Sequence, residues 1–270
     1  MARKNEMFKY IVAIRTAKNN SIYAGTGFFV KTDEEKIYLV TATHVARDTT
    51  TSTDIWLRNL TTGLPFVFKI SELNPMVMWL YHPLADMAIL EIQCGDKIDL
   101  SPYVLKLHFF EKNFLAIPER EESLTMYGMP DIYTDLEFAP FTCDSKPASS
   151  LWISHFDITG SNFKCFMLDK PSTQGFSGGP VISFENESQP ICYGIIHGTR
   201  KIILAENLQS WYIVRIYLSC LNTQRIIEKS SDQSLKTLLR SAGHPPICRN
   251  FFSCCKLRLL LCNGKRSGAN

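Results

Sequence analysis

Apolar residues along this chain gather in short runs separated by glycine, asparagine, aspartate, serine and threonine. Several runs alternate loosely between apolar and polar positions, which is typical of half-buried β-strands. We expect strands over residues 8–15, 24–30, 37–42, 54–60, 64–70, 76–81 and 87–92, and then over 123–128, 151–157, 162–168, 181–184, 191–196 and 211–216. Short strands at this regular spacing predict an all-β fold.

The two groups of strands are separated by a stretch, residues 94–120, in which the pattern is unclear. We interpret it as the crossing between two β-domains, residues 1–110 and 111–230. Apolar residues at helical spacing predict a helix over residues 219–229, which closes the second domain. Residues 231–270 then form a separate basic, cysteine-rich tail.

The tail differs from the rest of the chain in charge. It carries seven basic side chains and one acidic one, a net charge of +6, which leaves −3 for the rest of a chain whose total is +3. Within it, residues 251–262 are apolar and basic together but too short to span a bilayer. This segment either packs on the body or is disordered, or residues 248–266 dock to a partner or a membrane surface.

Composition limits the function classes of the body. The chain is 45% hydrophobic and 20% charged, as expected for a globular protein with a sizeable core. Nothing in the body indicates nucleic-acid binding. Nine cysteines are present without a CxxC pair or a Cys/His metal spacing, so we expect no zinc and no cofactor. An odd number of thiols and no convincing secretory signal predict a cytoplasmic protein with reduced cysteines.

Candidate chemistry begins with the stretch Thr-Gln-Gly-Phe-Ser-Gly-Gly-Pro-Val at residues 173–181. A serine hydroxyl needs a neighbouring base to act as a nucleophile, and glycine tolerates the dihedrals that turn successive N–H groups toward one point. The N–H groups of Gly175 and Ser177 are therefore candidates for an oxyanion hole. The stretch could also be an ordinary glycine turn or a strand-turn-helix elbow, but the strand and hairpin signals after it argue against the elbow.

Two further segments offer partners for this serine. His44 directly follows an apolar run that ends in small residues, and Asp86 lies in a loop at the start of another apolar run. The order along the chain is His, Asp, Ser. Of the known Ser-His-Asp hydrolases, the chymotrypsin type has this order.

These three segments resemble those of the trypsin-like, chymotrypsin-fold serine peptidases, closest to the bacterial HtrA-type and glutamyl-endopeptidase-like branch. The resemblance extends from about Phe8 to about Glu228. It implies two antiparallel six-stranded β-barrels with the site in the cleft between them. His44 and Asp86 would belong to the first barrel and Ser177 to the second.

The substrate pocket is expected around Pro171, Ser172, His197 and Gly198. Family members that cut after Lys or Arg carry an acid six residues before the serine, where this chain has Pro171. Glutamyl endopeptidases carry a pocket histidine at the position of Ile196, so His197 is one place off. Because one place changes the face of a strand, His197 is either a pocket residue or a rim histidine.

The resemblance also bears on how the loop is held. Digestive members of the family have an aspartate directly before the nucleophile, whereas this chain has Phe176. We therefore expect apolar packing of Phe176 to anchor the loop.

The function that these residues predict is a serine endopeptidase that cleaves a protein or peptide substrate through an acyl-enzyme. Two alternatives remain. The chain could be a catalytically silent binding module with a protease fold, or a proteolytic effector docked to a sensor or a membrane through its tail.

Overall fold

The structure is a computed structural model of the whole chain. The residues that it describes are 2–18, 21–82, 85–95, 98–111, 116–130, 138–149, 152–156, 161–186, 189–198, 200–204, 207–211 and 213–214. The chain divides into two compact units, Met1–Leu218 and Ser219–Asn270, and all described residues belong to the first. The predicted closing helix and the basic tail lie outside the described residues.

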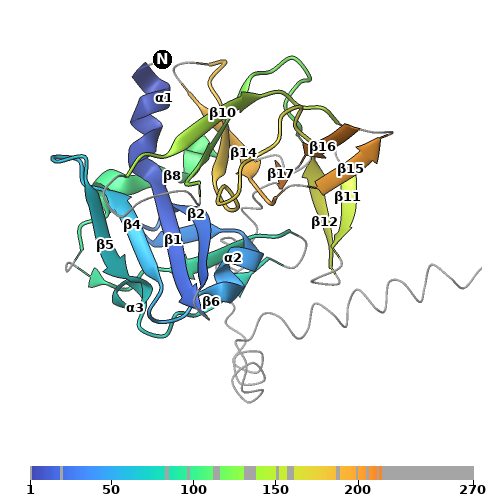
Figure 1. The fold of residues 1–270 in the computed structure, drawn as a ribbon. Coiled ribbons are helices and arrows are strands. Elements are labelled where there is room, and N and C mark those ends of the chain that lie inside the picture. The colour runs from blue at the N-terminus through green and yellow to red at the C-terminus, as the bar shows by residue number, and fades with distance from the viewer. Residues whose placement is uncertain are drawn as a thin grey trace, which may run out of the picture. The chain divides into compact units, whose positions relative to one another are not determined.

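The first half of the chain forms an eight-stranded sheet (Figure 1). Its strands are β1 (Ile11–Lys18), β2 (Ser21–Lys31), β3 (Ile37–Thr41), β4 (Asp54–Arg58), β5 (Pro65–Lys69), β6 (Trp79–Tyr81), β7 (Ala88–Glu91) and β8 (Val104–Lys106). Their order is β5-β4-β1-β2-β3-β7-β6, and β8 pairs in parallel with β2. Apart from the β2–β8 pair, these neighbours are antiparallel, which agrees with short connections between consecutive strands.

Short helices connect these strands. They are α1 (Ala2–Glu6), the 3-10 helix η1 (Met7–Tyr10), α2 (Thr43–Asp48), α3 (Ile70–Leu73), and the 3-10 helices η3 (Ser101–Tyr103) and η4 (Leu107–Phe109). A strand predicted to start at residue 8 thus begins at Ile11, because η1 takes the preceding turn. In the part of the chain that the structure describes, no helix is both long and apolar enough to cross a membrane.

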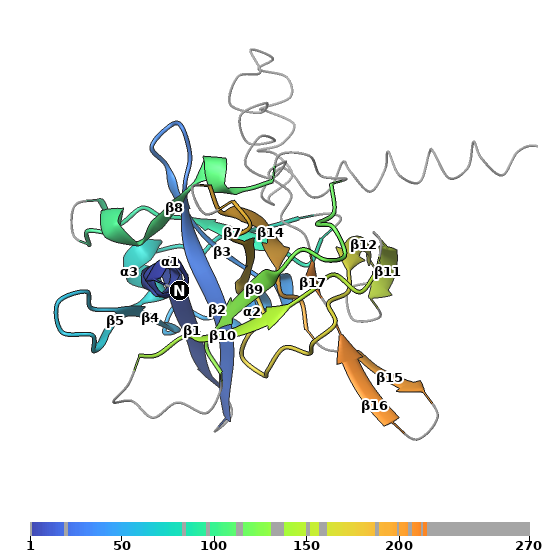
Figure 2. The ribbon, with the colours of Figure 1, turned by 90° about the horizontal axis from the view of Figure 1, so that it is seen from above.

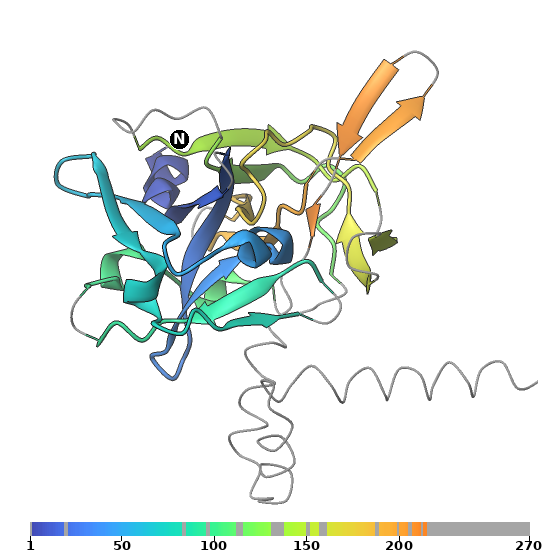
Figure 3. The same ribbon diagram turned by 60° about the horizontal axis from the view of Figure 1, so that its bottom comes forward.

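The second half forms a seven-stranded sheet and a separate hairpin. The sheet contains β9 (Leu124–Gly128), β10 (Phe141–Ser145), β11 (Trp152–Phe156), β12 (Ser161–Phe166), β13 (Pro180–Ser183), β14 (Ile191–Ile195) and β17 (Ile213–Val214), in the order β10-β9-β13-β14-β17-β12-β11. The hairpin pairs β15 (Arg200–Leu204) with β16 (Asn207–Trp211). Figure 3 shows the two sheets as separate groups of strands, the first in blue to teal and the second in green to orange.

The two sheets meet at strands β1, β2 and β9, which Figure 2 shows close together. The backbone N–H of Met129, just after β9, donates to the Thr26 hydroxyl of β2 over 2.8 Å. The start of the chain reaches the second sheet as well. The Lys4 ammonium lies 2.8 Å from a carboxylate oxygen of Asp144, and the Tyr127 hydroxyl donates to the Lys4 carbonyl. The second sheet is therefore hydrogen-bonded directly to the first sheet and to the start of the chain.

The all-β prediction is confirmed: the described part of the fold is mostly antiparallel sheet. The finer prediction of two six-stranded barrels is not. The described strands form open sheets of eight and seven, and no pairing among them joins the edge strands β5 and β6 or β10 and β11. The domain boundary at residue 110 stays a prediction.

Candidate active site

His44 lies in the first turn of α2, directly after the buried strand β3. Ala42 is extended, with φ −73° and ψ 146°, and the helix begins at Thr43. The first N–H groups of a helix have no partner within it. Here the backbone N–H of His44 donates to Asp86 Oδ1 over 3.2 Å, so the carboxylate also satisfies the start of α2.

Asp86 lies in the loop between β6 and β7 and is only 5% exposed. Its Oδ2 is 2.6 Å from His44 Nδ1 and is also hydrogen-bonded to His197 Nδ1. Burial by itself raises the pKa of this carboxyl. The hydrogen bonds and charges of His197 and His44 outweigh burial and hold its pKa well below its usual range. The carboxylate is therefore ionised at neutral pH.

The ionisation of Asp86 determines the tautomers of both rings. An ionised carboxylate accepts hydrogen bonds and donates none. His44 and His197 therefore each donate Nδ1–H to it, and Nε2 of His44 carries a lone pair when that ring is neutral. This is the form of imidazole that can take a proton from a hydroxyl group.

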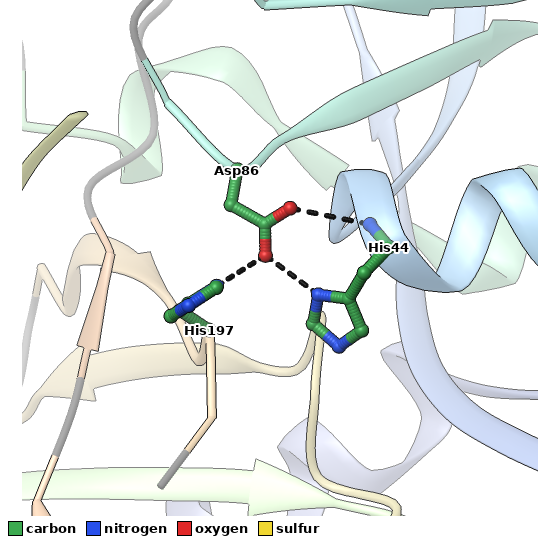
Figure 4. A group of neighbouring side chains, drawn as sticks. All are labelled: His44, Asp86 and His197. Carbon is green, nitrogen blue, oxygen red and sulfur yellow. Dashed lines mark hydrogen bonds and ion pairs between the residues drawn. The ribbon is translucent and has the colours of Figure 1, made fainter. Parts of the chain in front are cut away.

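His197 follows β14 and is 5% exposed. Its ring stands edge-on to that of His44, with the centroids 5.5 Å apart and the planes at 88° (Figure 4). Its backbone carbonyl accepts a hydrogen bond from the Ser177 hydroxyl over 3.2 Å. One residue thus contacts both Asp86 and Ser177.

Residues 173–179, called the glycine loop below, carry Ser177. The Phe176 N–H donates to the Thr173 carbonyl, and Gly175 has φ 91°, a value that glycine adopts without strain. Phe176 is 2% exposed and packs in the core cluster of the second sheet with Leu124, Met126, Phe166, Leu168, Val181, Tyr193 and Ile196. The expectation that Phe176 anchors the loop by apolar packing agrees with this burial.

Neighbouring backbone leaves no room for side chains at the two glycines after Ser177. A Cβ on Gly178, which has φ +88°, would lie 2.2 Å from the Thr26 carbonyl oxygen. A Cβ on Gly179 would lie 1.9 Å from the Tyr127 carbonyl oxygen. These glycines let the loop approach both sheets closely.

Thr26 of β2 holds the glycine loop from the first sheet. Its backbone N–H donates to the Ser177 carbonyl over 2.8 Å, and its hydroxyl donates to the Gly175 carbonyl over 2.6 Å. The Thr41 hydroxyl donates to the Thr26 carbonyl, which completes the hydrogen bonding of a fully buried residue. Both carbonyls that flank Phe176 are therefore turned toward the first sheet.

The oxyanion-hole candidates remain available. Among the described residues, neither the Gly175 N–H nor the Ser177 N–H donates to another group of the protein. The assignment of these two N–H groups to an oxyanion hole stays a prediction.

The predicted pocket residues are only partly brought together. His197 directs its ring nitrogen to Asp86, while Ser172 and Gly198 are half-buried and Pro171 is exposed. Asp169, the acid nearest to Pro171 in sequence, accepts hydrogen bonds from the Ser145 hydroxyl and the Lys146 N–H. The assignment of these residues to a substrate pocket stays a prediction.

The described residues also include possible metal ligands and thiols. His44, Asp86 and His197 have ligand-type atoms within 4.8 Å of one another, but the 2.6 Å His44–Asp86 separation fits a direct hydrogen bond and leaves no room for an ion. The described cysteines, Cys94, Cys143, Cys165 and Cys192, are free thiols. Burial raises the pKa of Cys165 and Cys192 to about 12, which makes these two poor nucleophiles.

Two contributions were not found from the sequence. Thr26 falls within the strand expected over residues 24–30, and its place between Gly25 and Gly27 is the sequence signal that could have indicated a close polar contact. His197 lies two residues beyond the end of β14, so the alternation of faces along a strand does not determine its contact with Asp86, which is 111 residues away in sequence.

No protein-family model matches the chain, and no curated protein matches it in sequence. Solved structures match its fold. The Rv3671c protease from M. tuberculosis, in its active form, has a TM-score of 0.53 and 16% identity, covering 78% of each chain. Two others are a product complex of tobacco etch virus protease (TM-score 0.49, 15% identity, 82% of this chain and 80% of that chain) and a Yersinia pestis serine endoprotease (0.49, 13%, 83% and 66%). The fold resembles that of chymotrypsin-like proteases.

Proposed function

We propose that the chain is a serine endopeptidase, with Ser177 as nucleophile, His44 as general base and Asp86 as the group that orients the base. The observation that carries the proposal is the buried, ionised Asp86 hydrogen-bonded to Nδ1 of a histidine that is still accessible. The side chain of His44 is 35% exposed, whereas that of Asp86 is 3% exposed. These exposed fractions support the proposal, because a general base must be reachable by a substrate while its orienting group can be buried.

Each residue then has a defined role in the reaction. Ser177 Oγ attacks the scissile carbonyl carbon while its proton passes to His44 Nε2. The carbonyl oxygen becomes negatively charged and accepts hydrogen bonds from the N–H groups of Gly175 and Ser177. The tetrahedral intermediate expels the amine, which takes the proton from His44 and leaves an acyl group on Ser177. Water activated by His44 then releases the acid product.

Before that reaction, the serine must change its hydrogen bond. Its hydroxyl donates to the His197 carbonyl over 3.2 Å, and no hydrogen bond joins it to His44 in the described part of the site. Catalytic hydrogen bonds are often long or misaligned without substrate, and rotation about one side-chain bond redirects the hydroxyl. The same observation favours the second candidate, a silent binding module in which Ser177 stays turned away.

The substrate class follows from the pocket side of the site. Pro171 offers no charge to a substrate ammonium, and Asp169 is already hydrogen-bonded. Burying an unpaired ammonium is costly, so the proposed enzyme prefers an uncharged or acidic residue before the scissile bond. Membership of the HtrA-type and glutamyl-endopeptidase-like branch, a cytoplasmic location and docking through residues 248–266 belong to the same proposal.

A fluorophosphonate probe tests the proposal, because it reacts with a serine activated by a base. We expect labelling of the full chain, with the adduct on Ser177 by peptide mapping, and no labelling of the Ser177→Ala or His44→Ala variants. Ser183→Ala is the matched control, since this buried serine lies in β13 outside the site. A folded wild-type chain that takes up no probe would favour the silent module.

A further inference from the structure

His197 and His44 share one carboxylate oxygen but differ in what else they can reach. Both rings bond to Asp86 Oδ2 through Nδ1. The His197 side chain is 6% exposed, against 35% for His44. A substrate therefore approaches the His44 ring, while the His197 ring stays in the interior beside the carboxylate (Figure 4).

The donors around Asp86 fix its orientation from two directions. His44 supplies its backbone N–H and its ring Nδ1–H from α2, and His197 supplies a ring Nδ1–H from the end of β14 in the other sheet. A carboxylate can rotate about its side-chain bonds when its donors lie on one side. A donor from the second sheet limits that rotation and keeps Oδ2 at the His44 ring.

We propose that His197 is a positioning residue of the reaction, whose ring N–H holds Asp86 in the orientation that His44 requires. This inference rests on the proposed peptidase function. The ring acts through Asp86 and the carbonyl of the same residue holds the resting Ser177 hydroxyl, so side-chain substitutions isolate the ring while leaving the carbonyl in place.

Three substitutions separate the N–H donor from the bulk of the ring. In His197→Asn the side-chain amide can occupy the place of Nδ1 and still donate to Asp86. In His197→Gln the amide reaches the place of Nε2, and in His197→Leu there is no donor. The matched control is Tyr193→Phe in β14, which removes the buried hydrogen bond from the Tyr193 hydroxyl to Glu122.

Steady-state kinetics on a peptide substrate give the first readout. We expect kcat to fall about 10- to 100-fold in His197→Leu and His197→Gln with KM nearly unchanged, because orientation is lost and substrate contacts are kept. His197→Asn should stay within a few-fold of wild type, and Tyr193→Phe should lose stability without loss of kcat. If His197→Leu does not fold, the contrast between Asn and Gln still decides.

The second readout does not depend on turnover. In the Ser177→Ala background, proton NMR detects the low-field resonance of the His44 Nδ1–H bonded to Asp86. We expect this resonance to persist in His197→Asn and to shift or exchange-broaden in His197→Gln and His197→Leu. An unchanged resonance in all three, or a kcat of His197→Leu equal to wild type, would overturn the inference. A chain without hydrolysis or probe labelling refutes the peptidase proposal, while the resonance still tests the role of His197.

Discussion

The two sides of the candidate site are held by different forces. On the first-sheet side, His44 is held by charge-assisted hydrogen bonds to the buried carboxylate of Asp86. On the second-sheet side, the glycine loop is fixed by apolar packing of Phe176 and by neutral hydrogen bonds to Thr26. His44 and Asp86, the proposed base and its orienting group, are thus both supplied by the first half of the chain, whereas the position of Ser177 depends on how the two sheets pack against each other.

The largest effect should come from removing one reacting group on each side. We expect Ser177→Ala and His44→Ala to lower kcat by about 10⁴- to 10⁶-fold, because both groups act in the same step. Activity assays on a peptide library, with far-UV circular dichroism as the folding control, give the measurement. A folded variant with near-wild-type turnover would contradict the assignment of that residue.

Phe176→Ala should separate packing of the loop from packing of the core in general. Truncation of a buried phenylalanine costs about 3–5 kcal/mol. The control is Phe166→Ala, which empties the same core cluster from β12. Both should lower the melting temperature, but at a temperature where both remain folded we expect a loss of probe labelling at Ser177 in Phe176→Ala alone. Equal labelling would show that packing of Phe176 does not position the loop.

Acid should destabilise the fold through His82, which directly follows β6 and precedes the loop that carries Asp86. Burial lowers the pKa of His82 from 6.5 to about 4. Between these pH values the unfolded chain binds a proton that the folded chain does not, so stability falls as pH drops, by about 3 kcal/mol in total. Asp86 acts at lower pH, because the stability from its depressed pKa is present above about 3.8 and is lost below that value.

Urea unfolding from pH 7 to pH 4 measures this effect. His82→Gln should flatten the dependence of unfolding free energy on pH between these values. A slope that persists in His82→Gln would assign the acid sensitivity to another group.

The smallest effect on kcat should come from removing the Thr26 hydroxyl, which links the two sides of the candidate site. Thr26→Val keeps the shape of the side chain but removes the hydroxyl that bonds the Gly175 carbonyl and Met129 N–H. We expect a loss of about 1–3 kcal/mol in stability and about a 10-fold fall in kcat, with recovery in Thr26→Ser.

Thr16→Val is its control. Thr16 is equally buried in β1, and its hydroxyl pairs with that of Thr53 over 2.8 Å. It should lose similar stability without loss of kcat. If both variants keep wild-type kcat, the hydroxyl of Thr26 does not influence the position of the serine.

Features that depend on local sequence patterns could be predicted, whereas those that depend on contacts between distant residues could not. The strands and the three segments with His44, Asp86 and Ser177 are local patterns, and strands β3, β4 and β14 lie close to where apolar runs placed them. The 3-10 turn at Met7–Tyr10 and the parallel pairing of β8 with β2 were missed, because they depend on packing rather than on local pattern. Contacts such as Thr26 with Gly175 join residues 149 positions apart, which no spacing rule encodes.

The crowding around Gly178 and Gly179 has a consequence for how such a sequence can diverge. A side chain at Gly178 would collide with the backbone carbonyl of Thr26, and one at Gly179 with that of Tyr127. Backbone atoms within packed sheets cannot move away as the end of a flexible side chain can. A descendant protein in which Ser177 is replaced would still need both glycines for its two sheets to pack together. Gene copies in which Ser177 has been replaced should therefore still have both glycines. The presence of the two glycines alone would then indicate common descent and not catalytic activity.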